Sequence, residues 1–342
     1  MKPKLLKTLS LTISLTAFVF VGILYLLLVH SSLNIDKSES LYVYPNQTID
    51  QVMNELKVKG NVNSTFIIKF ILKKLGAKST IPVGHYKIKP GTSDFKLARV
   101  LKGGAQTPVR ITFNNMRSVD QLAGRLSKQL MADSITILNC FRETTWIKED
   151  GFTEQNFMSV FLPNTYEMWW NSTPEKLLAL FRKEYKNFWN ENRRGKAEKI
   201  NLSLVQVSTL ASIVEEETNK SDEMPKVAGL YMNRLGIGMP LQADPTVKFA
   251  VGDFSIKRIL KGHTKIKSPY NTYTNIGLPP GPIRIPSIRA IEAVLSYESH
   301  SYIYMCAKSD FSGYHAYATT LGEHNKNASK YHDALNSRGI LE

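Results

Sequence analysis

The hydrophobic and polar positions of this 342-residue chain divide it into an apolar start and a long mixed remainder. Residues 8–29, TLSLTISLTAFVFVGILYLLLV, contain no charged side chain over 22 positions. At a rise of about 1.5 Å per residue, a helix of this length reaches roughly 33 Å, which is enough to cross the hydrocarbon core of a bilayer. The pattern therefore predicts a transmembrane helix at 8–29, with a cytoplasmic tail at 1–7 and a polar linker at 30–40.

A cleaved signal peptide is the alternative interpretation of the same run. The apolar stretch is longer than a typical signal-peptide core, and the residues that follow, VHSSLNIDKSES, contain no clear small-x-small cleavage site. We therefore expect an uncleaved, single-pass anchor. Lys2, Lys4 and Lys7 predict a cytoplasmic N-terminus by the positive-inside rule, which leaves about 310 residues outside the plasma membrane.

Beyond the linker, strand-like and helix-like runs are mixed, which predicts an α+β fold. Residues 41–105 combine two strand-like runs, LYVYP and GHYKIKPG, with three amphipathic runs that begin near residues 48, 64 and 93. We expect them to form a small module. Residues 106–342 are expected to form a second, larger domain, which includes a long helix opened by a capping box near residue 173.

Composition limits the partners of the extracytoplasmic part. The chain has 44 Lys and Arg against 29 Asp and Glu, a formal charge of +15, so an anionic partner is expected. The predicted location argues against nucleic acid and favours lipid headgroups or a cell-wall polymer. Cys140 and Cys306 are the only cysteines, so no disulfide framework is expected; we favour two thiols, with a single bridge as the alternative.

Three consecutive acids end an apolar run in LASIVEEETNK, residues 210–220. In a helix from about 203 to 218, Glu217 shares a face with three aliphatic residues, whereas Glu215 and Glu216 face small and polar positions. The aliphatic residues are Leu210, Ile213 and Val214. A carboxyl that continues an apolar face loses hydration, which raises its pKa and suits it to general acid catalysis. The alternative is that Glu217 only meets solvent, or a Lys or Arg, at the helix end.

The segments after this helix are rich in turn residues and polar side chains, which suits the walls of a cleft. From the helix onward, ASIVEEET, NRL, LQADPTV, SPYNTY, GLPPGPI, IPS and EHN follow one another. In this order they closely resemble the endolytic lytic transglycosylases of bacterial cell walls, the MltG or YceG-like family. The resemblance covers nearly the whole chain. It implies an N-terminal anchor, a LysM-like module at 41–105 and a YceG-like catalytic domain at 106–342 with a lysozyme-like, helix-borne Glu.

The resemblance also implies roles for individual residues. The family's catalytic acid is the Glu before Thr in an E-x-E-T motif, which here is Glu217 followed by Thr218. Asn164 stands in LPNTY where the family often has Asp, so we expect no acid there. The resemblance further implies polar and aromatic residues that bind substrate in or near the cleft. They are Asn233, Gln242, Asp244, Tyr270, Asn271, Thr272, Tyr273, His315, His324 and Asn325.

The implied reaction is cleavage between N-acetylmuramic acid and N-acetylglucosamine within nascent glycan strands, which leaves 1,6-anhydro ends and limits strand length. Neither a metal nor an organic cofactor is implied, because one acid serves both proton transfers. The expected partners are peptidoglycan strands, plasma-membrane lipids and peptidoglycan synthases, without nucleic acid. Two alternatives remain: a hydrolase that pairs Glu217 with Asp244, and a membrane-anchored, glycan-binding scaffold without activity. The histidines form no zinc motif such as His-Glu-x-x-His.

Overall fold

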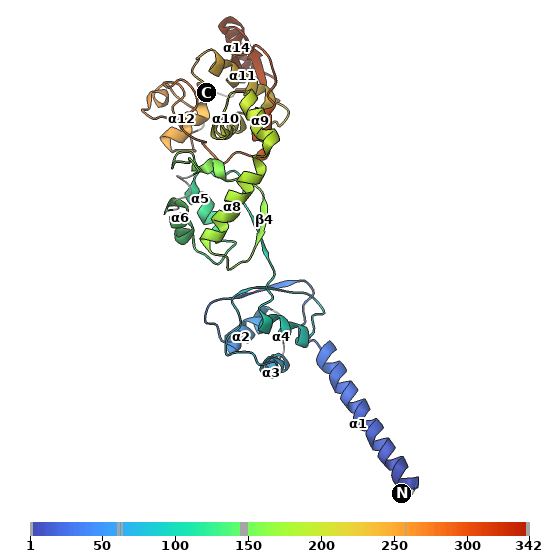
Figure 1. The fold of residues 1–342 in the computed structure, drawn as a ribbon. Helices are drawn as coiled ribbons and strands as arrows, with labels where there is room; N and C mark the ends of the chain where they lie inside the picture. Colours follow the sequence, from blue (N-terminus) through green and yellow to red (C-terminus); the bar gives the residue numbers. More distant parts are fainter. Residues whose placement is uncertain (1–2, 60–61, 63, 144–149, 257, 340–342) are drawn as a thin grey trace. The chain divides into compact units, whose positions relative to one another are not determined.

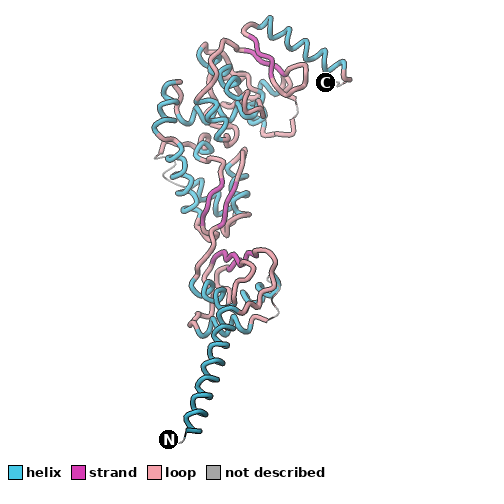
Figure 2. Tube along the Cα trace, turned by 90° about the vertical axis from the view of Figure 1, so that its right-hand side faces the viewer, coloured by secondary structure: helices cyan, strands magenta, loops and turns pink. Residues whose placement is uncertain are grey.

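The computed structural model describes residues 3–59, 62, 64–143, 150–256 and 258–339, from helix α1 to helix α14 (Figure 1). The chain divides into two compact units. The first contains residues 1–111, 129–131 and 167–172, and the second contains 112–128, 132–166 and 173–342. Among the described residues, strands pair into three two-stranded sheets, β1–β2, β3–β4 and β5–β6 (Figure 2). The mixture of helices with short strand pairs agrees with the predicted α+β class.

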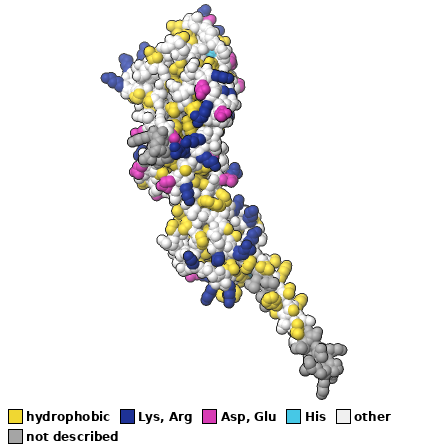
Figure 3. All heavy atoms as spheres, viewed as in Figure 1, with side chains coloured by type: hydrophobic (Ala, Val, Ile, Leu, Met, Phe, Trp, Pro, Cys, Tyr) yellow, Lys and Arg dark blue, Asp and Glu magenta, His cyan; other side chains and the backbone are white. Residues whose placement is uncertain are grey.

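Helix α1 spans Pro3–Val29. The structure does not describe the side chains of residues 1–11, 23, 24, 26 and 27. Part of the predicted transmembrane run at 8–29 lies among these residues. Several large apolar side chains on the rest of α1 are exposed (Figure 3). They are Ile13, Leu15, Phe18, Val19, Phe20, Val21, Tyr25, Leu28 and Val29. Within the described residues, no helix combines the length and the apolar character that crossing a membrane requires. The anchor stays a prediction.

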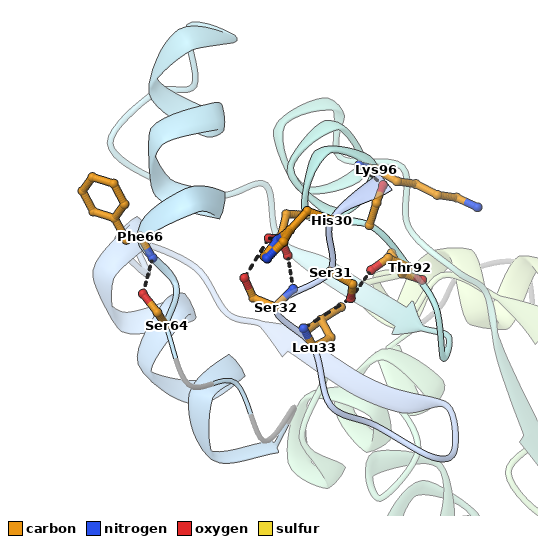
Figure 4. A network of polar contacts seen from close by, with 10 residues as sticks. His30, Ser31, Ser32, Leu33, Ser64, Phe66, Thr92 and Lys96 are labelled. Carbon is orange, nitrogen blue, oxygen red and sulfur yellow. Dashed lines mark hydrogen bonds and ion pairs between the residues drawn. The ribbon is translucent and has the colours of Figure 1, made fainter. Parts of the chain in front are cut away.

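The chain that leaves α1 is fixed to the start of helix α4, Asp94–Gly103 (Figure 4). The Asp94 carboxylate is fully buried and accepts hydrogen bonds from the backbone N–H and the hydroxyl of Ser32, at 2.9 and 2.7 Å. The Nδ1 of His30 lies 2.9 Å from the same carboxylate. Ser31 donates to the carbonyl of Thr92 at 2.9 Å. A negative charge at a helix N-terminus is favourable, so Asp94 joins α1 and α4 through one polar network.

The first unit forms around a small sheet with three helices. Strand β1, Glu39–Val43, pairs antiparallel with β2, Gly84–Ile88, so that Leu41 faces Tyr86 across the ladder. Helices α2, Ile49–Lys59, and α3, Phe66–Lys74, supply apolar side chains to a common core with the sheet and α4. The order of strands and helices is the predicted one, because alternating and amphipathic runs were clear there. A LysM-like identity stays a prediction.

Strands β3, Val109–Thr112, and β4, Thr165–Met168, form the second sheet, and the boundary between the units falls within them. In the second unit, helices α5, Val119–Ser127, α6, Ser134–Glu143, and α8, Pro174–Phe188, pack with the 3-10 helix η1, Phe157–Val160. Their core is aromatic: the rings of Phe161 and Phe181 lie 5.3 Å apart, and Phe113 and Tyr166 lie 5.6 and 5.4 Å from Phe181.

The remaining elements of the second unit place the site. They are α9 Glu191–Lys199, α10 Leu204–Glu217, α11 Met224–Gly236, α12 Asp244–Val251, η2 His263–Lys265, α13 Ile288–Leu295, β5 Tyr304–Ala307, β6 His315–Ala318 and α14 Leu321–Ser337. Helix α10 begins at a capping box of Ser203 and Gln206, and every residue from Val207 to Glu215 is buried. The predicted helix at 203–218 is thus confirmed, with α11 and α13 packed against it. No disulfide joins Cys140 to Cys306.

Candidate active site

The three consecutive acids at the end of α10 have three different environments. Glu215 is buried, and its Oε2 accepts the backbone N–H of Ser287, the N-cap of α13, at 2.8 Å. Glu216 accepts two hydrogen bonds from Arg117, at 2.8 and 3.0 Å, and another from Arg284. Glu217 accepts a hydrogen bond from the hydroxyl of Tyr231 and lies on the wall of a cavity. The sequence count missed the burial of Glu215, because that count considers one helix alone and α13 packs on this side.

The cavity beside Glu217 has a volume of about 260 Å³. Its lining comes from α10, α11, the start of α12, the loop at 273 and the β5–β6 pair. The residues are Glu217, Leu230, Tyr231, Arg234, Gln242, Asp244, Tyr273, Met305, Cys306, Ala307 and His315. Segments that are far apart in the sequence therefore meet around one carboxyl group.

The environment of Glu217 raises its pKa from 4.5 to about 6. Burial is the largest cause, because loss of water disfavours the ionised form. The hydroxyl of Tyr231 donates to Oε1 at 2.7 Å and opposes this rise, as do the charges of His315 and Arg234. The charge of Asp244 acts in the same direction as burial. Glu217 is therefore a carboxyl that exchanges its proton close to neutral pH.

Helix α11 supplies two side chains that the sequence analysis did not assign to the site. Tyr231 is buried, and its burial raises its own pKa well above 10, so it remains a hydroxyl donor to Glu217. Arg234 donates from Nε to the carbonyl of Ile303 at 2.6 Å and from Nη1 to that of Leu241 at 2.5 Å. The signal was their spacing, since residues three apart share a helix face. Arg234 belongs to the NRL motif, but the motif alone did not indicate that this side chain lines the cavity.

Asp244 and Tyr273 meet on the wall of the same cavity. The hydroxyl of Tyr273 donates to Oδ1 of Asp244 at 2.5 Å, and burial together with this bond raises the pKa of Tyr273. Asp244 is the first residue of α12. Gln242, just before it, has φ of 48°, a left-handed conformation that costs a non-glycine residue about 1–3 kcal/mol. Its backbone N–H bonds to the carbonyl of Thr272 at 3.0 Å, which holds this turn in place.

His315, the first residue of β6, is held by Glu223, a residue that the sequence did not indicate. The Nδ1 of His315 lies 3.1 Å from Oε2 of Glu223, and the backbone N–H of His315 donates to Oε1 at 2.7 Å. Thr218 adds a third bond to Glu223 at 2.7 Å. Burial acts to raise the pKa of Glu223, but these hydrogen bonds outweigh it and hold the pKa below its usual value. An ionised, buried Glu223 thus fixes the ring of His315 on the cavity wall.

The sequence of this chain matches the family model of the YceG-like family over residues 41–330. The chain belongs to the YceG-like family.

Relatives of this YceG-like chain are found among curated proteins and solved structures. The endolytic murein transglycosylase of Bacillus subtilis strain 168 is 29% identical over 308 residues, which cover 85% of this chain and 84% of that protein. The protein of the same name from Streptococcus pneumoniae strain D39 is 26% identical over 347 residues, 90% of this chain and 61% of its own length. A crystal structure of a YceG-like protein from Listeria monocytogenes matches with a TM-score of 0.58 at 23% identity, over 85% of this chain and 99% of that one. The last likeness shows a shared fold.

Of the residues that the family resemblance implied, four line the cavity with Glu217: Gln242, Asp244, Tyr273 and His315. Their roles in binding substrate stay predictions. They come from α12, two loops and β6, and the sequence alone contained no measure of the distances among them.

Three others are bonded into the framework of the unit. Asn271 is fully buried and donates to the carbonyls of Thr264 and Ile266, at 2.9 and 2.8 Å. The hydroxyl of Thr272 accepts the backbone N–H of Ala243 at 3.0 Å. Asn233 donates to two backbone carbonyls on the segment before β5, those of His300 at 2.7 Å and Tyr302 at 2.9 Å. These amide and hydroxyl groups hold the loops that carry the cavity wall.

The last three do not line this cavity. Tyr270 donates to the carbonyl of Gln155 at 3.0 Å and borders a different cavity of about 450 Å³. His324 packs against Tyr304 with ring centroids 5.4 Å apart, and burial lowers its pKa. Asn325 is exposed on α14. Among the residues that the structure describes, no three His, Cys, Asp or Glu side chains gather as they would around a metal ion.

Proposed function

We propose that this YceG-like protein is an endolytic peptidoglycan lytic transglycosylase with Glu217 as its acid and base. The observation that carries the proposal is a carboxyl group with a pKa of about 6 on a cavity wall, bonded on one oxygen to Tyr231. Such a group is protonated in about one molecule in ten at pH 7. The relatives named endolytic murein transglycosylases support the same substrate, because murein is peptidoglycan.

The proposed reaction uses the two protonation states of Glu217 in turn. The protonated carboxyl donates to the glycosidic oxygen while the bond from that oxygen to C1 of the muramyl sugar breaks, and the N-acetylglucosamine end leaves as an alcohol. The carboxylate then accepts the proton of the muramyl 6-hydroxyl as O6 bonds to C1. The product is a 1,6-anhydro end, no water is consumed, and Glu217 is protonated again.

The neighbours of Glu217 suit this alternation. Burial alone would keep the carboxyl protonated, whereas the Tyr231 hydroxyl and the charges of His315 and Arg234 favour the ionised form. The balance leaves both forms accessible near neutral pH. Tyr231 bonds to Oε1, and in the proposed reaction Oε2 exchanges the proton with the substrate. Glu223 influences Glu217 through His315, because it orients the ring of His315.

A hydrolase that uses Glu217 with Asp244 is the second candidate, because both carboxyl groups line the same cavity and Asp244 contributes to the raised pKa of Glu217. In that reaction Asp244 would activate water or attack C1, and the product would be a reducing end. The hydrogen bond from Tyr273 already engages one carboxylate oxygen of Asp244, which favours the transglycosylase.

Mass spectrometry of the soluble products tests both reactions. Purified peptidoglycan would be incubated with the detergent-solubilised full chain, and in parallel with Glu217→Gln and Asp244→Asn. Anhydro-muramyl ends from the wild type and from Asp244→Asn, with none from Glu217→Gln, are expected. Reducing ends that disappear in Asp244→Asn would establish the hydrolase. Glycan binding without any product would establish a binding scaffold instead.

We also propose that α1 anchors the enzyme in the plasma membrane with its N-terminus cytoplasmic, so that it acts on nascent strands near the synthases. The uncharged run at 8–29, the lysines before it and the exposed apolar side chains of α1 support this. Alkaline extraction of membranes should leave the full chain in the pellet, and added protease should digest the part after residue 30 only from the outer side. Release at high pH would contradict the anchor.

A further inference from the structure

A second cavity, of about 530 Å³, shares His315 with the Glu217 cavity. It lies against the start of α11, the β5–β6 pair and α14. It carries two Lys and three Tyr side chains together with three acids, whereas the described residues that line the Glu217 cavity include no Lys. The lining residues are Asp222, Glu223, Lys226, Glu298, Tyr302, Lys308, Tyr314, His315, Ala316, Tyr317 and Asn327. None of them except His315 and the buried Glu223 has a part in the chemistry proposed above.

The lysines of this second cavity are held mainly by aromatic rings. The Nζ of Lys226 lies 5.3 Å from the ring centre of Tyr302 and 5.2 Å from that of Tyr317, and 3.6 Å from Glu298. The Nζ of Lys308 lies 5.6 Å from the ring centre of Tyr314. A cation–π contact orients an ammonium group and leaves its N–H donors available to a carboxylate.

Acceptors stand close to these donors. The hydroxyl of Tyr314 donates to Oδ2 of Asp222 at 2.9 Å. A carboxylate accepts more than one hydrogen bond, so Asp222 can also accept one from a ligand amine or amide. Lys226 and Glu298 are both partly exposed. The cavity thus offers separate sites for negative and positive groups within one space, which suits a short peptide with free carboxylates and an amine. A glycan strand without stems carries one lactyl carboxylate on each muramyl residue and no amine, so it can occupy only part of these sites.

We propose that this second cavity binds the stem peptide of the muramyl residue whose bond is cleaved. The inference rests on the proposed function, because it needs a muramyl sugar at Glu217. The stem begins at the lactyl ether on C3 of the same ring whose C1 reacts, so its first residues must lie within a few ångströms of the catalytic cavity. The second cavity meets this condition, since the two share the His315 wall.

The inference predicts that peptide-bearing strands bind better than bare ones and that the lysines cause the difference. A partly exposed ion pair contributes up to a factor of about five in binding, so removal of both lysines should raise KM by up to about 25-fold. Turnover at saturation should change little, because neither lysine touches Glu217.

The experiment compares two substrates with the detergent-solubilised full chain. One is uncrosslinked peptidoglycan with its stems, and the other is the same material after an amidase has removed them. Anhydro ends would be counted for the wild type, for the Lys226→Met/Lys308→Met double variant, and for Lys186→Met on α8 as a control with the same type of change. The double variant should lose clearly more affinity for peptide-bearing strands than for bare ones, and the control should match the wild type.

The outcomes separate this inference from the proposed function. Equal KM values of the wild type on both substrates, or equal losses of the double variant on both, would overturn the stem-peptide site while cleavage itself stands. Cleavage of neither substrate by the wild type would overturn the proposed function, and the inference with it. Activity on bare strands also reports folding of the double variant, and thermal unfolding gives a second check.

Discussion

Replacing Glu217 with Gln should stabilise the protein at neutral pH, although it removes the proposed catalytic acid. The fold holds Glu217 at a pKa of about 6, whereas an ordinary Glu has a value of 4.5. The folded state therefore binds the proton more tightly than the unfolded state does. Above pH 6, where the carboxyl is ionised in both states, the fold carries the cost of a poorly solvated charge, and Gln has no charge.

The size of the effect follows from the raised pKa of Glu217. A rise from 4.5 to about 6 corresponds to about 2 kcal/mol in the free energy of unfolding. This cost is absent below pH 4.5, grows as the pH rises from 4.5 to 6, and is constant above that range. For a unit of about 200 residues, about 2 kcal/mol moves Tm by roughly 4–8 °C. Glu217→Gln should thus melt several degrees higher than the wild type at pH 8, and at the same temperature at pH 4.

Scanning calorimetry at these two pH values measures the effect, and Glu216→Gln is the matched control one residue away. Glu216 pairs with Arg117 and Arg284, so its replacement leaves two guanidinium groups without their charged partner. That variant should lose about 1–3 kcal/mol at pH 8. The same substitution at adjacent positions is therefore expected to change the free energy of unfolding in opposite directions at pH 8.

A Glu217→Gln protein that is less stable than the wild type at pH 8 would refute the reasoning. So would a gain of equal size at pH 4 and pH 8, because a gain that does not depend on pH cannot come from the titration of Glu217. In either case the raised pKa would no longer support a role as general acid.

Further predictions concern the neighbours of Glu217. The alkaline limb of kcat/KM against pH should begin near pH 6. Tyr231→Phe should move this limb to higher pH, because loss of the Tyr231 hydrogen bond raises the pKa of Glu217 further. The control variant Tyr331→Phe on α14 should leave the limb unchanged. Asn271→Ala should cost about 3 kcal/mol of stability in denaturant titrations, because two backbone carbonyls lose their donor; an unchanged midpoint would contradict its structural role.

Sequence patterns could predict the order of elements where each element relies on its own residues. Helix α10 is an example, because its aliphatic face and its Ser203 cap both lie within the segment. The same count placed Glu217 on the apolar face of the helix, but it missed the burial of Glu215, which depends on α13. Local signals therefore reach as far as one element and do not include the elements packed against it.

Partners from other segments could not be predicted in this way. Arg284, which pairs with Glu216, and Ser287, which bonds Glu215, lie about 70 residues away along the chain. Glu223 reads as an ordinary acid after α10, and its contact with His315 depends on how β6 packs. Asn271 and Asn233 have the polar character of cleft residues, yet they bond to backbone carbonyls, and only the folded loops show this.

The last turn of α10 distributes three identical side chains by rotation alone. Each residue of an α-helix turns by about 100°, so neighbouring acids leave the axis in directions a third of a circle apart. One anchors the start of α13, one neutralises two arginines, and one enters the cavity. Deleting a single residue earlier in α10 would exchange these tasks without changing the number of acids, and Thr218 would take the place of Glu217. The phase of the helix is therefore as necessary to the site as the carboxyl group itself.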